Sequence, residues 1–127
     1  MRRLLLFAAA ASFAASTAAY AHHSYAATYD VTREVKLEGK LVQFVYRNPH
    51  SFVHLEGPDE NGVAQRWAIE WGAGLQLNQQ GVMRDTLHVG DHVIIEGNPG
   101  RNAQDHRLRM RSMLRPSDGW KWSGTFQ

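Results

Sequence analysis

The chain has 127 residues, with 14 lysines and arginines against 12 acidic residues, seven histidines and no cysteine. This length fits one domain with a modest core, and the lack of cysteine excludes disulfides and thiolate metal sites. The near balance of charge argues against nucleic acid as a partner, because nucleic-acid binding depends on many basic side chains.

Residues 1–21 have the composition of a cleavable secretory signal peptide. Arg2-Arg3 gives a positive start, residues 4–15 are uncharged and mostly apolar, and Ala19-Tyr20-Ala21 has the small-x-small pattern of a cleavage site. The alternative is an uncleaved membrane anchor, although the apolar stretch is short for a bilayer span. We therefore expect a periplasmic protein that starts at His22, has no stable membrane anchor and keeps twelve basic and twelve acidic residues.

The remaining chain, residues 22–127, reads as short strands separated by turn-forming residues. Strands are predicted over residues 35–46, 51–56, 65–71, 92–96 and 106–114, with a helical segment over 75–80 and a further edge strand within 119–126. In the first strand the apolar residues change parity near Gly39, which predicts a bulge or a sharp coil there.

Three strands, a short helix and two more strands form the element order of the oligonucleotide/oligosaccharide-binding fold. We therefore predict an all-β domain: a small five- to six-stranded barrel of this kind with one short helix between strands 3 and 4. Residues 22–34 would form an N-terminal arm and residues 116–127 a C-terminal tail. A seven-stranded sandwich would need more strands and no helix.

The strongest candidate site is His22-His23-Ser24, directly after the expected cleavage point. An N-terminal histidine offers its α-amine and its imidazole to one metal ion, and a distant histidine could add a third nitrogen, an arrangement that suits copper. If cleavage leaves Ala21 first, the start Ala-His-His can also bind copper(II) through the amine, amides and an imidazole. Both cleavage positions thus predict a copper ion as the cofactor.

The segment from Asn48 to His54 supplies the candidate third ligand. His50, Phe52 and His54 share one face of an extended strand, but His50 and His54 would be ~13 Å apart along it, too far to bind one ion. We favour His50, because it stands beside the turn at Pro49. The alternatives are that His50 only caps this turn and that His54 is a half-buried strand residue.

The aromatic residues of the first three strands favour an alternative function, in which the protein is a recognition module that binds no metal. Trp67 and Trp71, with His54, would form part of a ligand-binding face for a glycan, a peptide or another envelope protein, unless these tryptophans belong to the core. Glu70 is expected to face outward, with a buried acid as the alternative. Arg107, Arg109 and Arg111 are expected on the solvated face of the fifth strand, with binding of an anionic ligand as the minority alternative. The sequence offers no persuasive catalytic constellation, and a copper-dependent oxidase is the weaker alternative to a non-enzymatic metal-binding protein.

Several segments resemble one known family in the expected order along the chain. They are His22-His23-Ser24-Tyr25-Ala26-Ala27, Asn48-Pro49-His50, Trp67-Ala68-Ile69-Glu70, Arg84-Asp85-Thr86-Leu87 and Val89-Gly90-Asp91-His92-Val93. The chain therefore resembles the domain of unknown function 6152 family of small exported proteobacterial proteins, whose mature chains begin with the pattern Ala-His-His-Ser-Phe. Tyr25 replaces the usual phenylalanine, and the helical segment lacks the usual Pro-Asn start. The resemblance implies export and a small β-barrel but no activity.

Overall fold

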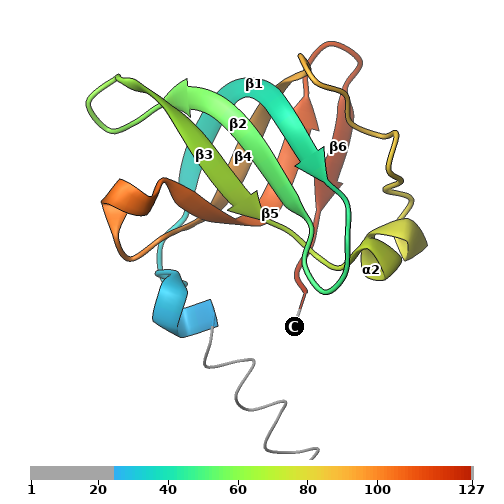
Figure 1. The fold of residues 1–127 in the computed structure, drawn as a ribbon, viewed down its shortest axis with the longest axis horizontal. Helices are drawn as coiled ribbons and strands as arrows, with labels where there is room; N and C mark the ends of the chain where they lie inside the picture. The colour runs from blue at the N-terminus through green and yellow to red at the C-terminus, as the bar shows by residue number, and fades with distance from the viewer. Residues whose placement is uncertain (1–24, 127) are drawn as a thin grey trace, which may run out of the picture.

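The computed structural model describes residues 25–126, and most of them form a barrel of five strands with a sixth strand at its side (Figure 1). The elements are β1 (Val35–Val45), β2 (Phe52–Pro58), β3 (Ala64–Glu70), α2 (Gly74–Gln79), β4 (His92–Pro99), the 3-10 turn η1 (Ala103–Asp105), β5 (Arg107–Arg115) and β6 (Trp120–Ser123). Residues 25–28 are helical as well. The strands and the helix lie close to their predicted positions.

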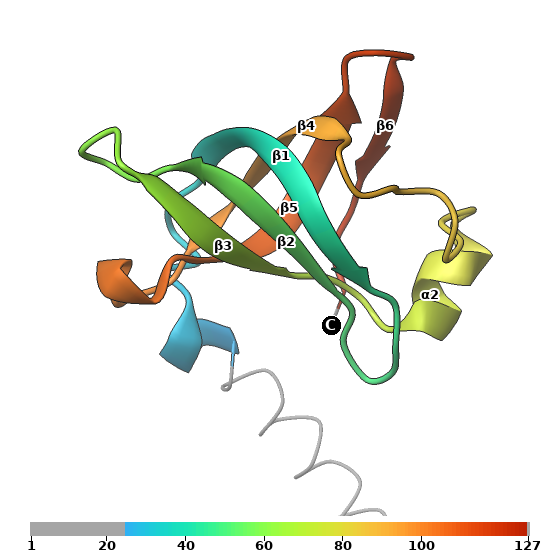
Figure 2. The same cartoon turned by 45° about the horizontal axis from the view of Figure 1, so that its top comes forward.

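The strands close into a barrel in the order β1-β2-β3-β5-β4. All neighbours pair antiparallel except β3 and β5, whose short parallel pairing completes the ring, and β6 pairs with the free edge of β5. Figure 2 shows β1, β2 and β3 crossing in front of β4 and β5. The predicted all-β barrel with one helix between strands 3 and 4 is confirmed.

The first strand curves strongly because it pairs with β4 along its first half and with β2 along its second half. A side chain at Gly39 would collide with the carbonyl oxygen of Glu56 on β2, so only glycine permits this close approach. The bulge itself lies between Leu41 and Gln43, just beyond the predicted position. Leu41 is fully buried before it, and Phe44 packs against the core after it.

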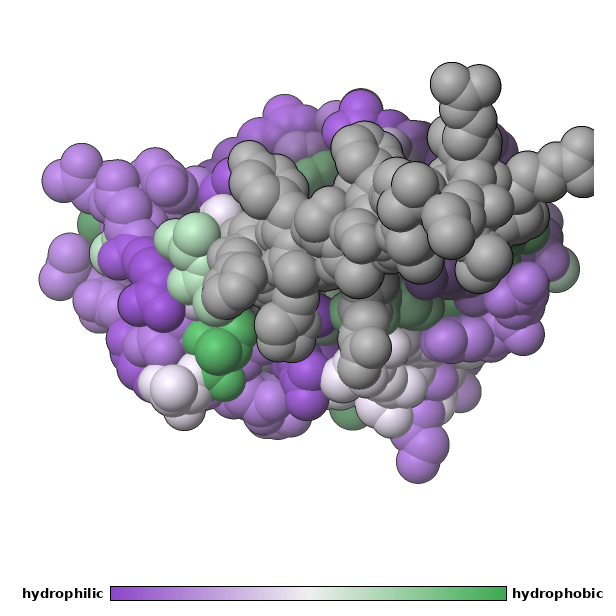
Figure 3. All heavy atoms as spheres, turned by 90° about the horizontal axis from the view of Figure 1, so that it is seen from below, coloured by the Kyte–Doolittle hydropathy of each residue, from purple (hydrophilic) through white to green (hydrophobic). Residues whose placement is uncertain are grey.

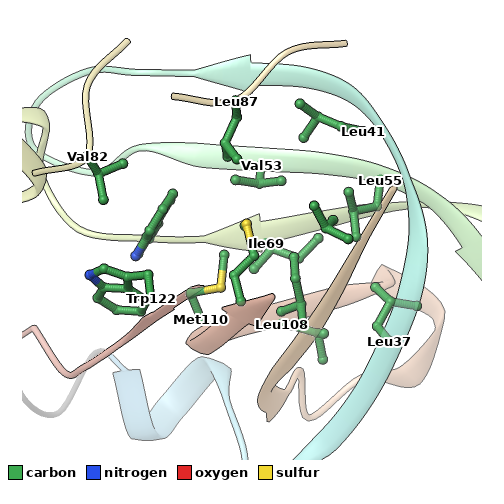
Figure 4. Packing of buried hydrophobic residues seen from close by; sticks show 14 of the residues in the cluster. Leu37, Leu41, Val53, Leu55, Ile69, Val82, Leu87, Leu108, Met110 and Trp122 are labelled. Atoms are coloured by element: carbon green, nitrogen blue, oxygen red, sulfur yellow. The ribbon is translucent and has the colours of Figure 1, made fainter. Parts of the chain in front are cut away.

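The core fills the barrel and continues under α2. Its residues include Leu37, Leu41, Val53, Leu55, Ile69, Val82, Leu87, Leu108, Met110 and Trp122, whose side chains converge in Figure 4. Leu77 on α2 and the following Val82 and Leu87 close one end of the barrel. Trp122 from β6 lies edge-on to Trp71, with ring centroids 5.0 Å apart, so the C-terminal tail is packed onto the core.

The opposite end of the barrel is bounded by two loops rather than by a helix. The hairpin loop between β2 and β3 and the segment containing η1 both lie there (Figures 1 and 2). Seen from below, the described surface is largely hydrophilic with scattered apolar residues (Figure 3). Among residues 25–126 no helix is both long and apolar enough to cross a membrane.

A half-buried arginine joins three segments near the end of the barrel closed by α2. Arg115 donates to the carbonyl oxygen of Thr86 (2.7 Å), to Asp91 (2.8 Å) and to Asp118 (2.9 Å). Burial opposes ionisation of Asp91, but the hydrogen bond from the His88 backbone and the contact with Arg115 outweigh it, so the pKa of Asp91 lies below its ordinary value of 3.8.

The lowered pKa of Asp91 gives a pH-dependent prediction for stability. A depressed pKa stabilises the folded state above the unfolded value and loses this effect as the pH falls through the folded value. Asp91→Asn should therefore lower the free energy of unfolding by about 1 kcal/mol at pH 6, and the difference from wild type should shrink below pH 3.8. Urea denaturation at pH 6 and at a pH below 3.8 measures the difference between the variant and the wild type. The exposed Asp85→Asn variant is the control. A difference independent of pH would contradict the prediction.

Candidate functional site

The N-terminal arm is fixed to the outside of the barrel by backbone hydrogen bonds. The amide of Asp30 donates to the carbonyl of Pro99 (2.9 Å), and the amide of Arg101 donates to the carbonyl of Thr28 (2.9 Å). Tyr29 is completely buried between them and forms an isolated bridge with Gly100. The arm therefore presents a defined surface beside β3 and β5.

Under this arm a histidine, a glutamate and two tyrosines form one cluster. The Nδ1 atom of His50 lies 2.9 Å from the hydroxyl oxygen of Tyr25 and 3.2 Å from Oε1 of Glu70. The hydroxyl of Tyr29 donates to Oε2 of Glu70 at 2.5 Å, and Arg107 lies 3.6 Å from the same oxygen. Residues distant in the sequence thus converge on the carboxylate of Glu70.

The position of Glu70 corrects one expectation. Its side chain does point away from the core of the barrel, but it is only 13% exposed because the arm covers it. The parallel pairing of β3 with β5 places Glu70 opposite Arg109 and near Arg107. A carboxylate covered in this way is stabilised by its cationic and hydroxyl neighbours.

The predicted solvated stripe of arginines is partly covered by the arm. The Arg109 guanidinium stacks 3.9 Å from the centre of the Tyr25 ring, and that of Arg107 lies 5.6 Å from the Tyr29 ring. Further along β5, Arg111 pairs with Glu34 at 3.3 Å. The expectation of a solvated face holds only in part: the side chains of Arg107 and Arg111 are 35% and 34% exposed, but the arm supplies aromatic and acidic partners for these cations.

Both tyrosines of the cluster remain protonated at neutral pH. Burial is the main cause of a raised pKa at each hydroxyl, and the negative charge of Glu70 adds to it, against the smaller opposing effect of the nearby arginines. The phenol of Tyr29 is consequently a hydrogen-bond donor to Glu70 throughout the physiological range, which ties the arm to β3.

One side of His50 is occupied by these contacts and the other side is open. A cavity of about 410 Å³ adjoins the histidine and is lined by Tyr25, Asn48, Pro49, His50, Gly72, Ala73, Leu75, Gln76 and Phe126. The side chain of His50 is 39% exposed. Since Nδ1 already contacts Tyr25 and Glu70, Nε2 is the ring nitrogen left for an external ligand.

The predicted metal ligands divide into one that the structure places and two that it does not describe. His50 belongs to the cluster, whereas His22 and His23 lie outside the described residues. Within residues 25–126, histidine, aspartate and glutamate side chains form no group of three or more that could hold a metal ion.

His54 lies apart from the cluster on the outward side of β2. Its ring stacks on Phe52 at a centroid distance of 6.4 Å, and it is half-buried, as the alternative reading stated. Burial, together with nearby Arg66 and Arg47, lowers the pKa of His54. His54 therefore stays mostly neutral at physiological pH.

The two tryptophans proposed as a ligand-binding face point into the barrel. Trp71 is only 2% exposed and packs in the core, so its assignment to a ligand-binding face is corrected. Trp67 is half-buried and packs against the same core from the open end of the barrel. The two residues share the inward parity of β3 with Ile69, which is why they cannot form an outer face.

Sequence reasoning missed Tyr25, Tyr29 and Arg109 as parts of this site. A signal for Glu70 and Arg109 was available, since charged residues alternate with buried apolar ones at the end of β3 and the start of β5. Their meeting depends on the parallel pairing of these strands, which no local pattern specifies.

Comparison with known protein families gives one match, over residues 10–109, to the domain of unknown function 6152 family, described as a family of unknown function. Neither the curated proteins nor the solved structures give a match. The matched region contains His22, His23, His50 and Glu70, together with the five barrel strands up to Arg109. The chain belongs to the domain of unknown function 6152 family, and its fold is a small β-barrel.

Proposed function

We propose that this protein is exported to the periplasm and binds copper(II) through His22, His23 and His50. The observation that carries the proposal is the contact between Tyr25 and His50. Tyr25 follows His22 by three residues, and three residues of chain span at most about 11 Å. The docking of Tyr25 thus keeps the expected mature N-terminus within reach of His50.

The chemistry of the donor atoms favours copper among the biological metals. The proposed ligands are the α-amine and imidazole nitrogens, with no thiolate in the chain, and nitrogen ligands of this kind prefer copper(II) in the divalent series. His50 would bind through Nε2, because Tyr25 and Glu70 occupy the Nδ1 side. A carboxylate behind a histidine ligand fixes its orientation and increases its basicity.

A role in buffering, carrying or sensing copper fits this arrangement. The described part of the site supplies one exposed imidazole beside a cavity, and its remaining groups hold the arm in place. In this proposal the docked arm serves to bring the chelating N-terminus close to the third nitrogen ligand, on His50.

The test is a copper(II) titration of the protein that begins at His22, followed by electron paramagnetic resonance. We expect tight binding with hyperfine structure from nitrogen ligands. A matched variant with four extra residues before His22 should bind at least about 100-fold more weakly, since it loses the chelate between the amine and the first imidazole. Mass spectrometry of the exported protein establishes its first residue. Equal binding by both forms, or no tight binding by either, would refute the proposal.

A further inference from the structure

The open end of the barrel contains a cavity of about 430 Å³ that is separate from the His50 cluster. It is lined by residues of the hairpin loop after β2 and of the segment that contains η1, and both segments lie away from α2 in Figures 1 and 2. Leu37, Trp67 and Leu108 provide apolar walls. Its volume falls within the range of small-molecule sites, about 300–1,000 Å³.

Two aromatic side chains are held in fixed positions at this cavity. The indole Nε1 of Trp67 donates to the carbonyl of Gly57 (3.2 Å), which leaves the carbon surface of the ring to line the cavity. The His106 ring stands at 71° to the Trp67 ring with centroids 5.2 Å apart. These contacts fix an aromatic wall at the open end of the barrel.

The backbone at His106 is in an unusual conformation that holds its ring there. Its φ of 47° lies in the left-handed region, which costs a residue with a side chain about 1 kcal/mol or more. Its carbonyl oxygen accepts the amide of Ala68 on β3 at 3.0 Å. Strain at a residue that lines a cavity points to a use for its side chain.

The charged residues around the cavity are of both signs: Arg33, Lys36, Arg101 and Arg107 against Glu38, Asp59 and Glu60. Glu38 is paired with His92 at 2.7 Å, and Asp59 accepts amide hydrogens of its own hairpin. In the described part of the chain Arg33 and Lys36 have no acidic side chain within ion-pair distance. Glu60, on the exposed hairpin loop, is the remaining acid of the lining. Unpaired cations beside an apolar wall favour an anionic ligand.

We propose that this cavity binds a short saccharide that carries a carboxylate. The apolar C–H face of a sugar ring would pack on Trp67, and the carboxylate would be attracted to Arg33 and Lys36. Side-chain amides of Asn61 and Gln104 on the rim offer donors and acceptors for hydroxyl groups. Arg107 borders both sites, since it lines this cavity and lies 3.6 Å from Glu70. None of the proposed copper ligands lines the cavity, so the two proposals can be tested separately.

The test is isothermal titration of the purified protein with a trimer of galacturonic acid, with neutral galactotriose and adenosine monophosphate as competing probes. We expect saturable binding of the acidic trimer, weaker binding of the neutral sugar and none of the nucleotide. Arg33→Gln combined with Lys36→Gln should reduce affinity for the acidic trimer about ten-fold and leave the neutral sugar unaffected.

The aromatic wall is tested by a pair of variants with a matched control. Trp67→Ala should weaken binding at least about ten-fold, and Trp67→Phe, which keeps an apolar ring and should fold, should weaken it less. Arg66→Ala removes the exposed neighbour on the outer side of β3 and should change nothing. Absence of saturable binding of the acidic trimer, unchanged binding by both Trp67 variants, or preference for the nucleotide would overturn the proposal.

Discussion

Replacing His50 with alanine is expected to weaken copper(II) binding by at least about 100-fold, because loss of even an outer partner of a metal ligand costs 10–100-fold. The imidazole is 39% exposed and contributes little to the core, so the barrel should remain folded. Competition titration against a chelator of known affinity measures the loss. The resonance spectrum should also lose one nitrogen coupling.

His54→Ala is the matched control for His50→Ala. Both residues are partly exposed histidines, His50 just before β2 and His54 within it. His54, however, stacks on Phe52 outside the cluster. The His54→Ala variant should bind copper(II) as the wild-type protein does. If His50→Ala bound copper(II) with unchanged affinity and spectrum, the ion would not use His50 and the proposed three-histidine site would be wrong.

Glu70→Gln has the second largest expected effect, because one carboxylate holds both the arm and His50. The amide keeps the shape of the side chain but removes the charge that Arg107 and the Tyr29 hydroxyl contact. We expect a loss of about 1–3 kcal/mol in the free energy of unfolding and copper(II) binding about 10–100-fold weaker. Chemical denaturation and the chelator competition measure the two effects.

The control for Glu70→Gln is Glu56→Gln on the exposed side of β2. It makes the same chemical change where no arm covers the carboxylate, and we expect it to alter neither quantity. Hydrogen exchange adds a readout specific to the arm: the Asp30 amide, bonded to Pro99, should exchange faster in Glu70→Gln. Unchanged exchange together with unchanged copper affinity would show that Glu70 does not position the site.

The barrel was predictable because its strands carry strong local signals. Buried and exposed residues alternate along β1 up to Leu41, and Asn48-Pro49 and Gly57-Pro58 mark the ends of β2. The position of the bulge was less predictable. Gly39 is needed for the close approach of β2, whereas the extra residue of the bulge lies just after Leu41. The sequence pattern showed a single change of parity and did not separate these two features.

The site was predictable only where one segment carried the signal. His50 was identified from the turn beside it, but the environment of Glu70 depends on two contacts between distant parts of the chain. One is the parallel pairing with β5, and the other is the docking of Tyr29. Alternation on one strand states which side a residue faces, but it does not state what covers that side. For the same reason the arginines of β5 were expected in solvent.

The two ends of the described chain meet on a single side chain. Arg109 stacks on Tyr25 and donates to the carbonyl oxygen of Phe126 at 2.6 Å. Arg109 therefore makes both contacts only when the Tyr25 and Phe126 segments are both in place. Displacing the C-terminal segment would leave the Arg109 guanidinium with the Tyr25 ring alone, while the backbone hydrogen bonds of Asp30 and Arg101 would still hold the arm.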